Sequence, residues 1–172
     1  MQKLQISAII VAVGLVVGFG SNQLAFAPGN HSPDFQITGD GFDDAGDAFL
    51  TVAGTAGGTT TDEAGDIYAY VFITNDFTGT LGTGIYAVTS HIGIEDSTEV
   101  GDDTAYHAHE VALDAANCVT GIAEDGVAAL AGNTVSVNTP GVVTTNPTTL
   151  TAVLSVDDEV NICVKHVFSG PA

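Results

Sequence analysis

The sequence predicts an all-β domain, an antiparallel β-sandwich of Ig-like or jelly-roll-like type, with a small β-barrel as the alternative. The apolar residues are largely Val, Ile and small Ala, and β-branched residues suit a pleated surface. The 21 glycines fall largely in turn clusters between short apolar runs, and they interrupt every helical pattern. A hydrophobic fraction of 45% supplies enough apolar surface for a core and argues against a disordered chain.

The strand predictions follow the short runs between turn clusters such as Gly57-Gly58-Thr59 and Asn146-Pro147. They are Asp34–Thr38, Ala48–Gly54, Ile67–Asn75, Gly84–Ile94, Thr104–Leu113, Cys118–Ala123, Thr134–Val137, Leu150–Val156 and Val160–Phe168. Short strands at this spacing are typical of sandwiches and barrels. The segment Glu124–Ala131 has some helical character, but Gly126 interrupts it and we expect no helix there.

The last two predicted strands form the clearest pair. Asp157-Asp158 fits a tight hairpin turn between Leu150–Val156 and Val160–Phe168. Strict alternation along the final strand places His166 on one face together with Val164 and Phe168.

The N-terminus has the pattern of a secretory signal. Lys3 precedes an apolar run, Ala8–Phe19, and a polar stretch then ends in Ala25-Phe26-Ala27. The run is shorter than the roughly 20 residues of a membrane-spanning helix. We expect residues 1–27 to be a signal peptide, cleaved somewhere between 20 and 27, and residues 28–172 to be a single secreted domain. A retained N-terminal anchor is the alternative.

The charge balance excludes several classes of partner. The formal net charge is −19, with 21 acidic residues against two lysines and no arginine. Such a chain lacks the basic patch of a nucleic-acid binder and does not suit an anionic membrane. Removal of the signal peptide leaves Lys165 as the only strong base. The expected partners are therefore metal ions or other surface proteins.

Cys118 and Cys163 are the only cysteines, and an exported chain meets oxidising conditions. We expect them to form a disulfide. The alternative is a thiolate ligand or nucleophile with His166 as its partner. Residues three apart on a strand point to opposite faces, which disfavours that pairing of Cys163 with His166.

The most suggestive chemistry is the stretch Tyr106-His107-Ala108-His109-Glu110. Histidines two apart on a strand project from the same face and can converge on one Zn or Cu ion. His91 and His166 are the candidates for further ligands, with Asp102 or Asp103 in reserve. The alternatives are structural histidines hydrogen-bonded to nearby groups, or a catalytic histidine.

The carboxylates cluster in loops, and the best calcium candidate is the GDGFDDAGD stretch. Its possible ligands are Asp40, Asp43, Asp44 and Asp47. The stretch does not match an EF-hand, since Phe42 occupies the position two after Asp40. The alternative is a set of solvated turns on an acidic extracellular protein.

The sequence carries none of the standard catalytic signatures: no GxSxG elbow, phosphate loop, dinucleotide fingerprint or HExxH. The leading interpretation is therefore a non-enzymatic exported protein that binds Cu or Zn through its strand histidines. A calcium-stabilised cell-surface adhesion or assembly module is the first alternative. A metal-dependent oxidoreductase is the second.

Several stretches together resemble small secreted proteins of ammonia-oxidising archaea that have no assigned activity. They are Ile67–Phe72, Gly84–His91, Tyr106–His109 and Val160–Phe168 with its cysteine. Such organisms rely heavily on copper enzymes outside the membrane. The resemblance therefore implies copper rather than zinc, and it implies no catalytic residue.

Overall fold

The computed structural model describes residues 32–58, 66–73, 84–91, 105–138, 147–156 and 161–169. The predicted signal peptide, Asp102, Asp103 and the predicted turn at Asp157-Asp158 lie outside these ranges. Within the described ranges, no helix has the length and apolar character needed to cross a membrane.

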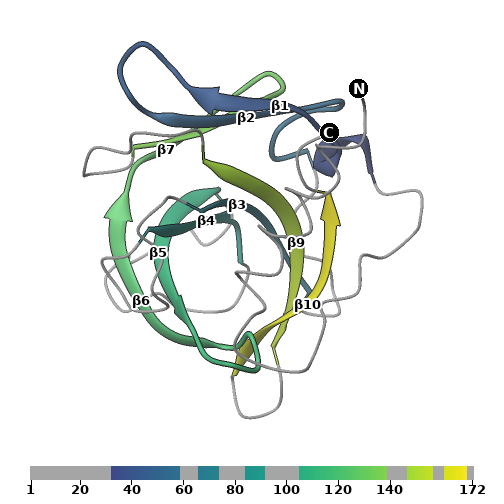
Figure 1. Ribbon diagram of the computed structural model, residues 1–172. Helices are drawn as coiled ribbons and strands as arrows, with labels where there is room; N and C mark the ends of the chain where they lie inside the picture. Colours follow the sequence, from purple (N-terminus) through teal and green to yellow (C-terminus); the bar gives the residue numbers. More distant parts are fainter. Residues whose placement is uncertain are drawn as a thin grey trace, which may run out of the picture.

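The described residues form a 3-10 turn, η1, and two antiparallel sheets (Figure 1). The four-stranded sheet has the order β1-β2-β8-β7, and the six-stranded sheet has the order β10-β9-β3-β4-β5-β6. The bounds are η1 Pro33–Phe35, β1 Ile37–Phe42, β2 Ala48–Val52, β3 Ile67–Ile73, β4 Ile85–Thr89, β5 His107–Leu113, β6 Val119–Gly126, β7 Ala128–Ala131, β8 Thr134–Val137, β9 Thr148–Val156 and β10 Ile162–Ser169. The predicted all-β sandwich is confirmed.

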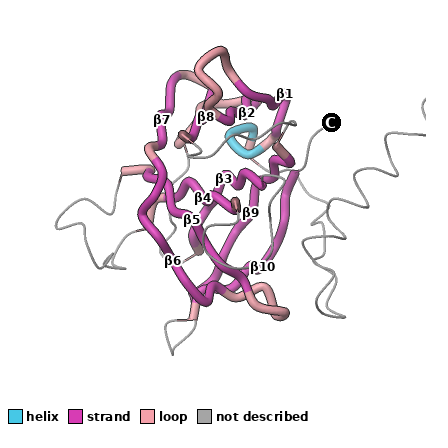
Figure 2. Tube along the Cα trace, turned by 60° about the vertical axis from the view of Figure 1, so that its left-hand side comes forward, coloured by secondary structure: helices cyan, strands magenta, loops and turns pink. Residues whose placement is uncertain are grey.

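The main core lies between the two sheets, which form separate layers in Figure 2. Phe35 of η1 stacks on Tyr68 and Tyr70 of β3, with ring centroids 5.0 and 5.2 Å apart. The four-stranded sheet contributes alternate residues such as Leu50 and Val135, both fully buried. The alternation in the sequence thus places one side of each strand in this shared core.

The six-stranded sheet is strongly curled, and its strands follow one another around a ring in Figure 1. Register shifts interrupt both outer pairs, β5–β6 and β10–β9, whereas the inner pairs β9–β3, β3–β4 and β4–β5 are joined without a shift. A bulge bends its strand and increases the local twist. The shifts therefore lie where they can bend the two edges of the sheet toward each other.

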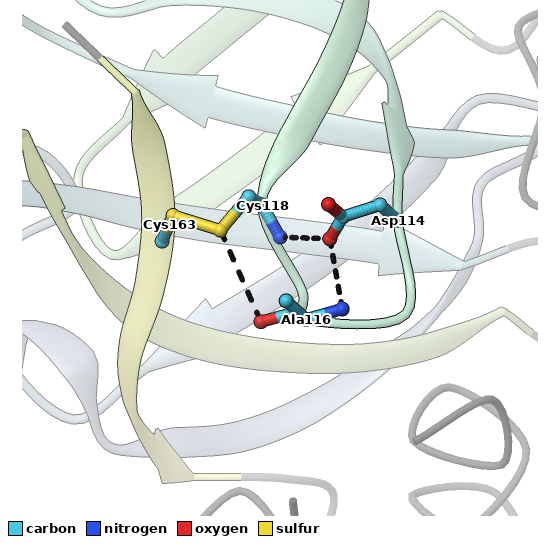
Figure 3. The surroundings of a disulfide bond; sticks show 4 residues. All are labelled: Asp114, Ala116, Cys118 and Cys163. Atoms are coloured by element: carbon cyan, nitrogen blue, oxygen red, sulfur yellow. Dashed lines mark hydrogen bonds between the residues drawn. A yellow bond between two sulfur atoms is a disulfide. The ribbon is translucent and has the colours of Figure 1, made fainter. Parts of the chain in front are cut away.

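The two edges meet at the predicted disulfide, which is confirmed. Cys118 and Cys163 are bonded, and their backbones also form an isolated antiparallel bridge. The amide of Val164 donates to the carbonyl oxygen of Asn117 at 3.0 Å. The Asp114 carboxylate accepts from the amides of Ala116 and Cys118, which shapes the turn that leads into the bond (Figure 3). The curled sheet is thus a half-barrel that is closed at this point.

The curl gives the sheet a concave face, opposite to the face that packs on the four-stranded sheet. Its largest apolar cluster has members on five of the six strands: Ile73, Ile85, Ala87, Val111, Leu150, Ala152 and Val167. A second, smaller core inside a curled sheet is a feature of a β-barrel. The fold therefore combines the predicted sandwich with a feature of the predicted alternative, the small barrel.

One sequence prediction for an individual element was wrong, and one strand was not predicted. The first strand was placed at Asp34–Thr38, but Pro33–Phe35 form the 3-10 turn and β1 begins at Ile37. Ser32 caps that turn by accepting from the Asp34 amide, and Pro33 suits its first position. Ala128–Ala131 forms strand β7, because it pairs with β8 at the edge of the four-stranded sheet. Tertiary pairing overrides the weak intrinsic preference of this alanine-rich stretch.

Candidate metal centre

The candidate metal centre lies on β4, β5 and the residues that follow β4. The register pairs Thr89 with His107 and Ala87 with His109. His91 comes two residues after Thr89, so the alternation along the chain places it on the same face. His91 and His109 are each 5% exposed, and His107 is half-buried. Three of the predicted ligands, His91, His107 and His109, are therefore brought together on the concave side of the sheet.

The three imidazole rings approach one another through their Nε2 atoms. The His91 and His107 Nε2 atoms are 2.9 Å apart, and those of His91 and His109 are 3.5 Å apart. One ligand atom from each ring lies within 4.8 Å of the others. A tetrahedral zinc ion about 2.0–2.1 Å from each nitrogen would separate the nitrogens by roughly 3.4 Å. The two spacings of 2.9 and 3.5 Å lie near this value.

A backbone hydrogen bond sets the orientation of the His107 ring. Its Nδ1 lies 2.9 Å from the carbonyl oxygen of Ala105, and a carbonyl oxygen can only accept. Nδ1 therefore carries the proton, and in the neutral ring the Nε2 lone pair faces the other two histidines. Metal-binding histidines commonly donate their second N–H to a carbonyl or carboxylate in this way.

The residues next to the histidines in sequence occupy the other face of the sheet. Ser90 is fully buried, and burial raises the pKa of the Tyr106 phenol well above its ordinary value. Glu110 is 3% exposed, and its Oε1 accepts from the Gly84 amide at 3.0 Å. The bond between Glu110 and Gly84 joins β5 to the start of β4. The sequence offered no signal for it, because it joins residues far apart in the chain.

His166, the fourth predicted ligand, does not join the cluster. It lies on β10, and β9 and β3 separate that strand from β4. A register shift after Val164 pairs His166 with Val153 of β9. Val153 in turn pairs with Tyr68 of β3, which packs against the core between the two sheets. His166 therefore lies on the face of the sheet that is opposite to the histidine cluster. The prediction that His166 shares a face with Val164 was wrong, because the bulge breaks the simple alternation.

The four aspartates proposed for calcium do not converge either. Asp40 accepts from the Thr149 hydroxyl, and the Asp47 carboxylate accepts from the Asn138 side chain. The Asp43 carboxylate accepts from the amides of Ala45 and Asp47 in its own turn, and Asp44 is exposed. Within the described ranges, the His triad is the only group of three or more His, Cys, Asp or Glu residues close enough to share an ion.

No protein-family model, curated protein or solved structure matches this chain. The assignment of a function therefore depends on the geometry of the site itself.

Proposed function

We propose that this chain is an exported, non-enzymatic protein that binds a transition metal, Cu or Zn, through His91, His107 and His109. The observation that carries this proposal is the convergence of three imidazole Nε2 atoms, two pairs of them at 2.9 and 3.5 Å. Imidazole suits both metals, and three protein ligands leave a coordination position for water or another molecule.

On chemical grounds, we expect the site to bind copper more tightly than zinc. Divalent copper exceeds zinc in affinity for a given nitrogen site. Export is supported by the Cys118–Cys163 disulfide, since such bonds persist in oxidising compartments. It is also supported by the signal-like pattern of residues 1–27.

The first prediction concerns metal affinity. His107→Ala removes one of three ligands, and we expect the affinity for Cu(II) and for Zn(II) to fall at least about 100-fold. For comparison, loss of a group that only supports a ligand typically costs 10–100-fold. Calorimetric titration, together with elemental analysis of the dialysed protein, measures the change.

His166→Ala is the matched control. It removes a histidine from the same curled sheet but on the opposite face, so metal affinity and stoichiometry should stay at the parent values. Equal binding by His107→Ala and the parent protein would overturn the proposal. So would a loss in His166→Ala as large as that in His107→Ala.

The open coordination position favours a second candidate, a metal-dependent oxidoreductase. Three protein ligands plus one exchangeable position is the arrangement of many catalytic metal sites. Superoxide turnover by the copper-loaded protein tests this candidate. Turnover that exceeds free copper and disappears in His107→Ala would favour the enzyme, and its absence would favour the binding role.

A further inference from the structure

The interior of the curled sheet contains a cavity of about 60 Å³. All six strands contribute to its lining, and Asn117 is the one polar residue among the lining residues. Three alanines, Ala69, Ala87 and Ala152, lie on the neighbouring strands β3, β4 and β9. Their short side chains do not reach across the curl, and the space between the strands is left unfilled.

We propose that this cavity binds a small, uncharged, apolar molecule. The site is separate from the metal centre, because none of the three clustered histidines lines it. The two sites are nonetheless neighbours on one face, since Ala87 of the lining pairs with His109. The inference does not depend on metal binding.

The volume limits the size of the ligand. An apolar protein cavity of about 150 Å³ holds benzene, and about 10–15 Å³ is enough for one water molecule. A cavity of about 60 Å³ lies between these limits. It suits a xenon atom or a hydrocarbon of about two to four carbons.

The chemistry of the lining excludes charged ligands. None of the lining residues is charged, so an anionic head group would find no partner there. Lys165 is the one strong base in the described ranges, and it forms an ion pair with Asp66. A polar molecule would lose its hydrogen bonds to water on entry, whereas apolar cavities of this kind stay dry and take up apolar guests.

The arrangement of the strands excludes a large partner. The edge strands β6 and β10 are joined by the Cys118–Cys163 bond and by the hydrogen bond from Val164 to Asn117. The concave face is therefore not an open groove along its whole length. It is suited to a small molecule rather than to a peptide strand.

Xenon and propane are the probes for the test, with acetate as a charged molecule of similar size. Methyl NMR spectra of the full chain report on Val71, Ile73 and Leu113, all of which line the cavity. We expect saturable shifts of these methyl resonances with xenon and with propane, and none with acetate. An absence of shifts with both apolar probes would overturn the proposal, as would equal shifts with acetate.

Two variants locate the bound molecule. Ala87→Leu fills the cavity, and we expect at least a tenfold loss of xenon affinity. Val111→Ala enlarges it, and we expect benzene, which is too large for the parent cavity, to bind and raise the melting temperature. If the filled variant does not fold, Val111→Ala alone decides the question.

Val88→Ala is the matched control for the enlarged variant. Val88 is fully buried on the same sheet but packs in the core between the sheets. Xenon-induced shifts of Val71, Ile73 and Leu113 should keep their parent size and affinity in this variant. Failure of benzene to affect a folded Val111→Ala, or parent affinity for xenon in a folded Ala87→Leu, would contradict the assignment of the site.

Discussion

At the scale of single residues, the tautomer of His91 distinguishes the metal-free triad from a metal site. His107 Nδ1 donates to the Ala105 carbonyl, so the neutral His107 ring has an unprotonated Nε2. That atom lies 2.9 Å from His91 Nε2, a distance at which one nitrogen donates to the other. His91 Nε2 is then the donor in the neutral pair. A metal ion would need the lone pair of His91 Nε2, so in the neutral ring the proton would have to move to Nδ1.

A second residue-scale contact ties η1 to the six-stranded sheet. The Tyr70 hydroxyl donates to the Asp34 carbonyl at 3.0 Å and accepts from the Gly57 amide at 2.9 Å. We predict that Tyr70→Phe lowers the free energy of unfolding by about 1–3 kcal/mol, because it leaves two backbone groups without this partner. Urea denaturation at neutral pH measures the loss. A midpoint equal to that of the parent protein would contradict this role.

Tyr70 also makes stability sensitive to alkali. Burial raises its pKa from 10.0 to about 12 in the folded protein. Between these two pH values the phenol is ionised in the unfolded chain and neutral in the native one. Its contribution to stability is therefore complete below pH 10 and is lost as the pH rises toward 12. We predict a shallower fall of stability across this range in Tyr70→Phe, and an identical pH profile in the two proteins would refute the assignment.

At the scale of the elements, the register of β4 and β5 determines the site. Antiparallel pairing places Thr89 beside His107 and Ala87 beside His109, which leaves His91 at the end of the same row. A slip of one residue would move the side chains of one strand to the other face and separate the ligands. The Glu110–Gly84 hydrogen bond opposes such a slip from the far side.

The disulfide is an element-scale link because it joins the two edge strands of the half-barrel. The cysteines are 45 residues apart in the chain, which corresponds to about 4 kcal/mol in the chain-entropy view of cross-links. We predict that the double variant Cys118→Ser, Cys163→Ser loses about 2–5 kcal/mol of unfolding free energy. Chemical denaturation measures this loss.

The same variant should expose the contact between the edges. The Val164 amide, bonded to the Asn117 carbonyl, should exchange with deuterium faster than it does in the parent protein. Reductant should destabilise the parent protein by a similar amount and leave the double variant unchanged. Unchanged stability of the double variant would show that strand pairing alone closes the half-barrel.

At the scale of the whole molecule, the dominant property is uncompensated negative charge. The formal net charge of −19 comes with only two lysines, one of which, Lys165, is paired with Asp66. A net charge so far from zero keeps a chain soluble but opposes its compact state through self-repulsion. Long-range repulsion of this kind outweighs one exposed ion pair, which contributes little.

Salt should therefore stabilise this protein. Raising the ionic strength from about 0.01 to 0.1 M shortens the screening length from about 30 to 10 Å. We predict that the melting temperature rises by several degrees over this interval, measured with sodium chloride and a chelator present to exclude trace metals. Sucrose at equal osmolality controls for solvent effects. A melting temperature that falls with salt would show that specific ion pairs dominate.

The fold class was predictable because alternation and turn chemistry are local properties of the chain. The common face of His107 and His109 follows from their spacing of two along one strand. The disulfide followed from there being only two cysteines in a chain with an export pattern.

The completed site was not predictable, because it depends on which strands become neighbours. His91 belongs to the triad because β4 pairs with β5, and His166 is excluded because a bulge turns it to the opposite face three strands away. The closure of the half-barrel and its apolar cavity likewise arise from bulges and pairings between distant segments. The sequence by itself thus determined most of the strands, the cysteine pair and the strand histidines. The tertiary structure decided the third ligand and the curl, because strand order and bulges depend on long-range packing rather than on local pattern.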